Sequence, residues 1–412
     1  MKGIKKIKNY RLIREIGKGA VGIVYEAVDD VNNKKFAVKS MATDKLKGNQ
    51  EYEKNMINSF KQELKILRNL DHHNIIKIFG VEKTNNNIYL ILEYANGGNL
   101  YEYLNFYKKN YKAPLTEQIV QFLVRQISKG IEYMHKNNVT HRDIKLENIL
   151  LHFPQVQGAV DYQSVKIEEA IVKIADLGYA KELQGDDVMK TICGTPMSMA
   201  PDIIKNYGNY KSGSEKTYNS KVDLWSLGTI TYELLFGVPP FFARTIEELF
   251  SQIMEGKYNM PQNSKVSIEA ITFLNGLLQF NADLRIDWDE IKIHPFLVNK
   301  VRDFHLVDIE QVIPDKNNKK PQLDSKDPNN FLWVLLKPKD NVVKDIVKLD
   351  KVDKSIFLNP KVLNEISHKP NDIPKDSGLG NDQKKVELEV VNEDKRTNSK
   401  EVKIDKKSIG SK

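Results

Sequence analysis

The sequence predicts an α+β protein with two lobes: a small antiparallel-sheet lobe with one helix, followed by a larger, mainly helical lobe. Two observations support this. Up to residue 94 the apolar residues form short β-rich runs separated by turns, and beyond residue 115 they recur mostly at helical spacing. A glycine-containing stretch over residues 95–98 separates the two regions as a flexible joint. A chain of 412 residues with 40% hydrophobic content can bury the core that such a fold needs.

Composition excludes several classes of protein. The formal charge of +8 is modest, its signs are interspersed, and no basic stripe alternates with aromatic residues, so we do not expect nucleic-acid binding. Cys193 is the only cysteine, which excludes an intramolecular disulfide and fits a reducing compartment. The basic N-terminus lacks the apolar core of a signal peptide, and no stretch approaches the roughly 18–20 apolar residues of a membrane span. We therefore expect a soluble, cytoplasmic protein.

The first predicted hairpin contains the run Gly17-Lys18-Gly19-Ala20-Val21-Gly22 between two strand-like segments. A single G-x-G-x-x-G pattern is weak, and an ordinary hairpin is the alternative reading. The strand–turn–strand context differs from the dinucleotide fingerprint, in which the third glycine opens a helix. Glycines here would let the backbone lie close to a polyphosphate, because they have no Cβ atoms to clash with it.

Lys39 ends the apolar segment over residues 35–39. Such a lysine is commonly a surface residue, but after a glycine hairpin it suits a cation that grips the α- and β-phosphates. It then needs an anionic partner. The candidate is Glu63, on an amphipathic helix marked by Phe60, Leu64 and Leu67, although an exposed glutamate is the simpler reading of any single helix position.

The segment over residues 88–94 reads as a buried strand that ends at the joint. An adenine ring needs an apolar slot with backbone donors and acceptors at its edge. Glu93 to Ala95 could supply that edge, with Leu92 controlling access behind it. His72 and His73 are expected to be turn residues, because two adjacent histidines without further ligands make a poor metal site.

A long helix is expected from Thr116, its predicted N-cap, with an apolar stripe that runs to Met134. This helix supports the octet from His141 to Asn148, which contains an acid, two bases, a carboxamide and an imidazole. Its Asp-x-Lys-x-x-Asn spacing has the form of a catalytic loop with a base, a phosphate-neutralising cation and a metal-binding amide. Leu150 follows and could form an apolar floor beneath adenine.

Residues 152–170 are predicted to form a surface insertion, after which a strand leads to Asp176. A carboxylate at a strand end suits a metal-binding oxygen, although Asp-x-Gly alone is a common turn. Arg142 has no chemical role in the octet, so it suggests an anion from elsewhere, such as a phosphate on Thr191.

A capping box is predicted at residues 220–223, followed by a buried helix that ends at Gly237. Asp223 could tie down the backbone of the octet. Residues 301–412 are polar and expected to be largely disordered, apart from the apolar island 331–336. That island could dock on a partner or on the main domain, or pack as a simple extension.

With these motifs in this order, residues 10–296 resemble the eukaryotic protein-kinase family, with a lobe boundary between residues 94 and 95. Lys145, two residues after Asp143, and the run Gly194-Thr195-Pro196 resemble the serine/threonine type. Within the family, the Thr-x-Cys-Gly-Thr-Pro-Met-x-Met-Ala-Pro run is most similar to the autophagy-initiating Atg/Unc-like kinases, with calmodulin-dependent-like kinases next.

The resemblance implies ATP and Mg²⁺ as cofactors and serine- or threonine-containing proteins as substrates. It implies catalytic roles for Asp143, Lys145, Lys39 and Glu63, metal binding by Asn148 and Asp176, and regulatory roles for Arg142, Thr191 and Thr195. The residues expected to contact the nucleotide are Ile16, Gly17, Lys18, Gly19, Ala20, Val21, Gly22, Val24, Ala37, Lys39, Glu93, Ala95 and Leu150.

Three residues depart from the family pattern. Leu177 replaces a phenylalanine but stays apolar, and Val21 replaces an aromatic residue at the tip of the glycine turn. Asp202 replaces a glutamate, so its expected ion pair with Arg285 must span an extra methylene. A pseudokinase scaffold is the competing class, but every member of the catalytic set is present.

Overall fold

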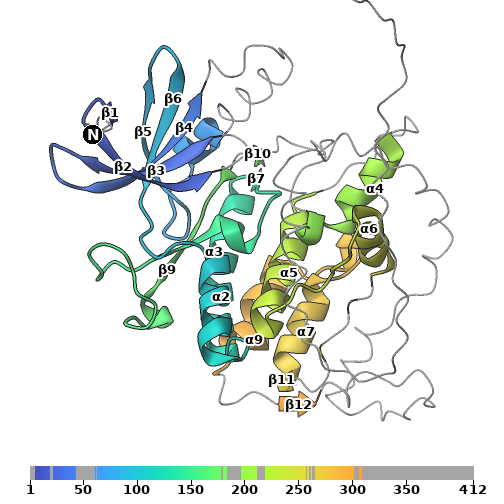
Figure 1. The fold of residues 1–412 in the computed structure, drawn as a ribbon. Helices are drawn as coiled ribbons and strands as arrows, with labels where there is room; N and C mark the ends of the chain where they lie inside the picture. The colour runs from blue at the N-terminus through green and yellow to red at the C-terminus, as the bar shows by residue number, and fades with distance from the viewer. Residues whose placement is uncertain are drawn as a thin grey trace, which may run out of the picture. The chain divides into compact units, whose positions relative to one another are not determined.

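The computed structural model describes residues 5–18, 22–42, 61, 63–177, 180–182, 196–210, 219–256, 258, 261, 265–300 and 306–308. All of them lie in one unit, residues 1–368 (Figure 1). No helix among these residues is long and apolar enough to cross a bilayer.

The first lobe is a six-stranded antiparallel sheet in the order β1-β2-β3-β4-β6-β5. Its strands are β1 (Lys6–Ile7), β2 (Tyr10–Lys18), β3 (Ile23–Asp29), β4 (Lys35–Ala42), β5 (Ile78–Lys83) and β6 (Asn87–Glu93). The sheet begins before residue 10, because β1 folds back and pairs with the start of β2. A helix over residues 63–69 lies between β4 and β5 in the chain.

The two faces of this sheet serve different cores because neighbouring residues of a strand point to opposite sides. Val38 of β4 pairs with Ile91 of β6, and both belong to a small cluster that also contains Phe36 and Tyr89. The opposite face of β4 carries Ala37, which belongs to the main core together with Leu90 and Leu92. Lys39 is two residues beyond Ala37, so it lies on the face that meets the second lobe.

The second lobe is mainly helical (Figure 1). Its helices are α2 (Leu100–Tyr111), α3 (Glu117–Lys136), α4 (Pro201–Tyr210), α5 (Val222–Phe236), α6 (Ile246–Glu255), α7 (Ile268–Leu277), α8 (Trp288–Ile293) and α9 (Pro295–Val298). Thr116 caps α3 through a hydrogen bond from the Ile119 amide, as predicted. Gly237 ends α5 in the left-handed conformation at φ 72°, which glycine adopts without a Cβ clash.

Short strands and turns complete the lobe. The strand pairs are β7 (Val139–Thr140) with β10 (Lys181–Glu182), β8 (Ile149–His152) with β9 (Ile171–Ile174), and β11 (Lys265–Ser267) with β12 (Leu306–Asp308). Single 3-10 turns occur at Leu146–Asn148, Ile167–Glu169, Pro196–Ser198 and Ala282–Leu284. The β8–β9 hairpin leads from the predicted octet to Asp176.

The predicted capping box at residues 220–223 is wrong. Lys221 is the residue that precedes α5, and no side chain caps the helix there. Asp223 is fully buried, and its carboxylate binds backbone amides of another segment. Because the Asp223 carboxylate accepts hydrogen bonds from amides outside the helix, it does not form a capping box with Ser220.

Two other expectations need adjustment. The insertion over residues 152–170 is not wholly at the surface, because Phe153, Ile167 and Ala170 are buried in the main core. The C-terminal region is not entirely without structure, since β12 pairs with β11. The apolar island 331–336 lies outside the described residues.

Candidate active site

Lys39 makes two ion pairs at the junction of the lobes, one buried and one partly buried. Its Nζ donates to Glu63 Oε1 at 2.9 Å and Oε2 at 2.7 Å, and to Asp176 Oδ1 at 2.9 Å. Lys39 is 7% exposed and Glu63 only 1% exposed. The predicted partner of Lys39 is thus correct, and Glu63 lies deeper than the edge of the helix face where it was expected.

The charges of Lys39, Glu63 and Asp176 shift one another's pKa values. Burial alone would lower the pKa of Lys39, but the carboxylates of Asp176 and Glu63 outweigh it and raise that pKa. The Lys39 ammonium in turn lowers the pKa of Asp176 to about 2. The Asp176 side chain is 44% exposed, so it can reach other ligands while it stays ionised.

The octet from His141 to Asn148 holds its functional groups close together. Asn148 Nδ2 donates to the Asp143 carbonyl at 2.8 Å and to Asp143 Oδ2 at 3.0 Å. Lys145 Nζ lies 3.4 Å from the same Oδ2. Asp143 is only 4% exposed, so these contacts and the loop backbone fix its orientation.

Asp223 fixes the backbone of this loop from beneath. Its Oδ2 accepts a hydrogen bond from the His141 amide and its Oδ1 accepts one from the Arg142 amide, both at 2.8 Å. Arg142 has φ 68°, a conformation that costs energy for a residue with a side chain. The buried carboxylate offsets that cost, and the prediction that Asp223 ties down the octet is confirmed.

The loop is also joined to the strand that carries Asp176. The Asp143 amide donates to His141 Nδ1 at 3.2 Å, which makes Nε2 the protonated nitrogen of that imidazole. His141 Nε2 then donates to the Ala175 carbonyl at 3.0 Å. The Ala175 amide donates to the Asn148 carbonyl at 2.9 Å, so both ends of the octet hold the residue that precedes Asp176.

Asp176 itself has φ 62°. Two of the six described non-glycine residues with positive φ, Arg142 and Asp176, therefore lie in this site. Strained backbone of this kind persists only where surrounding contacts hold it, as they do here.

The glycine turn is described at its ends only. Gly17 pairs with Val24 and Lys18 with Ile23 in the β2–β3 hairpin. A Cβ on Gly22 would lie 2.1 Å from the Ser40 carbonyl oxygen, so β4 itself requires glycine there. Gly19, Ala20 and Val21 lie outside the described residues.

Four of the residues predicted to contact the nucleotide belong to the main core or pack against it. Ala37 is buried in the main core, and Val24, Ala95 and Leu150 pack against it with partial exposure. Ile16 is 38% exposed and is not part of that cluster.

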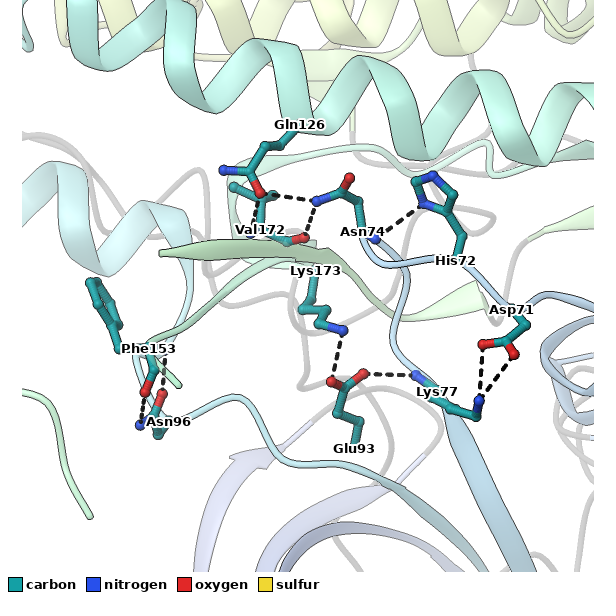
Figure 2. A network of polar contacts seen from close by, with 10 residues as sticks. All are labelled: Asp71, His72, Asn74, Lys77, Glu93, Asn96, Gln126, Phe153, Val172 and Lys173. Atoms are coloured by element: carbon teal, nitrogen blue, oxygen red, sulfur yellow. Dashed lines mark hydrogen bonds and ion pairs between the residues drawn. The ribbon is translucent and has the colours of Figure 1, made fainter. Parts of the chain in front are cut away.

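Glu93 is committed through both its backbone and its side chain. Its amide donates to the Lys77 carbonyl at 2.8 Å, and its carboxylate pairs with Lys173 of β9 at 2.7 Å (Figure 2). Lys173 is 7% exposed. This ion pair links the strand before the joint to the strand before Asp176.

Beside it, Asn74 connects the lobes through its side chain and backbone (Figure 2). Its Nδ2 donates to the Val172 carbonyl at 2.9 Å and to Gln126 Oε1 at 3.0 Å. Its carbonyl accepts the Ile174 amide at 2.8 Å. The β9 strand is therefore held by both lobes.

The joint is fastened to the second lobe. Asn96 Nδ2 donates to the carbonyls of Phe153 and Val156, and Asn96 Oδ1 accepts the Phe153 amide. Tyr162 of the insertion donates to the Gly97 carbonyl. The expected flexibility of the joint is thus restricted from Asn96 onward.

The regulatory residues are only partly described. Thr191 and Thr195 lie outside the described residues, as does Cys193. The expected ion pair between Arg285 and Asp202 is present, and Arg285 is 2% exposed. The shorter aspartate still reaches its partner.

The donor set of Asn148 and Asp176 fits Mg²⁺. Both offer hard oxygen atoms, and Asn148 Nδ2 is committed to Asp143, which leaves Oδ1 as the amide's remaining donor atom. No group of three or more His, Cys, Asp or Glu residues in the described part of the chain could hold a metal ion. Two protein oxygens supplemented by phosphates are typical of magnesium sites in phosphoryl transfer.

Three contributors escaped the sequence reasoning: Lys173, Asn74 and His135, the last of which bonds Asp223 at 2.8 Å. Lys173 had a usable signal, because a lysine within an apolar strand needs an anionic partner. Glu93, at the end of another predicted strand, could neutralise its charge. Asn74 and His135 had none, since their partners are remote in sequence.

Comparison with known proteins agrees with this geometry. The family model described as "Protein kinase domain" matches residues 10–297. "Myosin light chain kinase A" of Dictyostelium discoideum is 34% identical over 292 residues, which cover 70% of this chain and 88% of that protein. "Serine/threonine-protein kinase ATG1" of Kluyveromyces lactis is 30% identical over 351 residues, 77% of this chain and 39% of that protein. "Calcium-dependent protein kinase 3" of Plasmodium yoelii yoelii is 33% identical over 301 residues, 72% and 49% respectively.

Proposed function

The chain belongs to the protein kinase family as a protein serine/threonine kinase, and from this premise we propose how its residues transfer the γ-phosphoryl group of ATP to protein hydroxyls. The observation that carries the proposal is the contact of Lys39 with both Glu63 and Asp176. That contact aligns the cation of the first lobe with the acid at the end of β9.

Each residue has a distinct role in the proposed mechanism. Asp143 orients the substrate hydroxyl and accepts its proton, and Lys145 neutralises charge on the γ-phosphoryl group. Lys39, held by Glu63, binds the α- and β-phosphates. Positioning and electrostatic stabilisation carry most of the rate, because the transition state is loose and highly charged.

Asn148 and Asp176 are the residues that would hold Mg²⁺. When bound, Mg²⁺ would supply positive charge that offsets the charge of the phosphates. The low pKa of Asp176 keeps its carboxylate ionised for this purpose at neutral pH.

Substitution of the catalytic set tests the proposal. Asp143→Asn and Lys39→Met should each lower the transfer of labelled phosphate from ATP to a generic protein substrate by at least 10²–10³-fold, roughly what one such group contributes. Asp289→Asn, at a 93% exposed side chain, is the control and should keep normal activity. Wild-type turnover in either variant would refute the assignment of that residue to the catalytic set. ATP binding without transfer by the unaltered chain would favour the pseudokinase alternative.

Phosphorylation of Thr191 is the proposed activating step. Arg142 sits in the catalytic loop with its backbone fixed by Asp223, and a phosphate on Thr191 would bring about two negative charges to it. Thr191→Ala should lower kcat by about tenfold, and phosphatase treatment of the unaltered protein should reproduce the loss. An alanine variant as active as the phosphorylated protein would refute this step.

The finer assignments are also proposals. Autophagy-initiation signalling is supported by the Thr191–Pro201 run and by relatives named ATG1, whereas relatives named myosin light chain and calcium-dependent kinases support the calmodulin-dependent-like alternative. A peptide-array assay compares the two, because each predicts a different substrate preference. We further propose a cytoplasmic location and a docking role for residues 331–336.

A further inference from the structure

Trp288, the first residue of α8, hydrogen-bonds to His135 in the last turn of α3. Its Nε1 donates to His135 Nδ1 at 3.0 Å across a separation of 153 residues. The rings meet edge to face, with centroids 5.4 Å apart and an interplanar angle of 72°. The other imidazole nitrogen, Nε2, lies 2.8 Å from Asp223 Oδ2.

This contact identifies which nitrogen of His135 carries the proton. An indole N–H can only donate, so Nδ1 must present its lone pair to Trp288. The ring proton of the neutral imidazole then resides on Nε2, where it donates to Asp223. The side chains of His135 and Asp223 are 7% and 0% exposed, so water cannot readily replace either bond.

The same carboxylate holds the catalytic loop. Asp223 accepts the amides of His141 and Arg142 as well as His135. If Nδ1 carried the only ring proton, the lone pair of Nε2 would face a buried anion. The Asp223 carboxylate would then lose a donor and gain a repulsion, which favours its rotation away from the loop.

Trp288 is itself held in place without help from His135. Asp287 accepts the amides of Asp289 and Glu290, and Glu290 accepts the Asp287 amide, so a capping box fixes the first turn of α8. The Ile286 amide also donates to the Gly276 carbonyl at 3.1 Å. The indole donor is therefore pre-positioned by α8 and its preceding turn.

Other charged groups surround His135 on the packed elements. Asp223 of α5 faces its Nε2, and the His141 amide donates to the same oxygen of that carboxylate. On α3, Glu132 pairs with Lys136, and Lys292 of α8 pairs with the same Glu132. Lys136 and Lys292 are thus both paired with Glu132, and Lys292 also pairs with Asp289.

We propose that Trp288 is a positioning residue for phosphoryl transfer, which together with Asp223 fixes His135 as the Nε2–H tautomer and so holds its imidazole as a donor to the carboxylate that binds the catalytic loop. This inference rests on the proposed function for its effect on turnover, but its effect on His135 is independent of activity. It connects a helix far along the chain with the octet.

Trp288→Phe in the full chain tests the proposal, because it removes the N–H donor and keeps an aromatic ring. Nitrogen-15 NMR of histidine-labelled protein should show His135 as a single Nε2–H tautomer in the unaltered chain. In the variant Nδ1 loses its donor, so the Nδ1 resonance of His135 should shift and the Nε2–H signal should broaden. Its kcat should fall about three- to tenfold with the KM for ATP within twofold. An unchanged His135 signal in the variant would overturn the proposal.

Two further variants separate tautomer selection from general loosening. Trp225→Phe removes a buried indole N–H that has no hydrogen-bond partner in the described part of the chain. It should lower stability yet leave the His135 signal unchanged. In a His135→Gln background, Trp288→Phe should lower kcat no further, and a full additional loss would show that Trp288 acts by packing alone. Absence of phosphoryl transfer in the unaltered chain would overturn the proposed function but not the tautomer result.

Discussion

Single buried polar residues determine the geometry of this site. Asp223 accepts three hydrogen bonds and has no exposed surface, and Lys39 neutralises two carboxylates from different lobes. A buried ion that loses a partner is strongly destabilising, because the remaining charge has no solvent to replace it. These residues therefore tolerate few substitutions even where they do not touch a substrate.

Asp223→Asn keeps the shape of the side chain but turns one acceptor into a donor. The amide would face an N–H group in either orientation, so one buried donor loses its partner, at a cost of about 1–3 kcal/mol. We expect unfolding free energy to fall by that amount and kcat to fall by at least tenfold. Chemical denaturation and steady-state kinetics measure the two effects. Equal stability of the variant and the unaltered chain would contradict this account of the loop.

At the scale of elements, the neighbouring strand β4 constrains one end of the glycine turn. A Cβ on Gly22 would overlap a backbone carbonyl of β4, whereas a Cβ on Gly17 would meet Val24 at 3.7 Å, an ordinary contact. Steric contact with a neighbouring strand therefore requires glycine at position 22 but not at position 17. The ends of the octet are likewise held from outside, because His141 and Asn148 both bind Ala175, the residue that follows β9.

Gly22→Ala should destabilise the protein by about 1–3 kcal/mol, as overpacking usually does, because Ser40 belongs to a strand and cannot move aside freely. Gly17→Ala is the matched control and should change the melting temperature little. Thermal unfolding of the two variants compares them directly. A melting temperature that falls equally in both would mean that the contact with β4 is not the cause.

At the scale of the whole molecule, the strand β9 is the seam between the lobes. Asn74 binds it from the first lobe, Gln126 supports it from α3, and Lys173 returns a cation to Glu93. Because Asp176 lies two residues beyond the end of this strand, contacts that hold β9 also help to hold the acid opposite Lys39.

Asn74→Ala removes one buried and one partly buried hydrogen bond from this seam. The carbonyl of Val172 and the amide oxygen of Gln126 lose a donor, so unfolding free energy should fall by about 2–4 kcal/mol. Asn110→Ala is the control, because Asn110 makes a single exposed bond to its own helix. Denaturant unfolding of the two variants measures the effect. A decrease in unfolding free energy below about 0.5 kcal/mol for Asn74→Ala would contradict the proposal that Asn74 stabilises β9.

The sequence by itself determined the bilobal fold class and pointed to the residues proposed as the catalytic set, because these depend on local periodicity and on motifs a few residues long. It also predicted the pairing of Lys39 with Glu63 and the role of Asp223. Only the tertiary structure showed that no side chain caps the helix of Asp223, and that the Ser40 carbonyl leaves no room for a Cβ on Gly22. It also showed that Lys173 forms an ion pair with Glu93. It alone joined Trp288 to His135. Such contacts link residues far apart in the chain, where no spacing rule applies and only packing and burial select the partner.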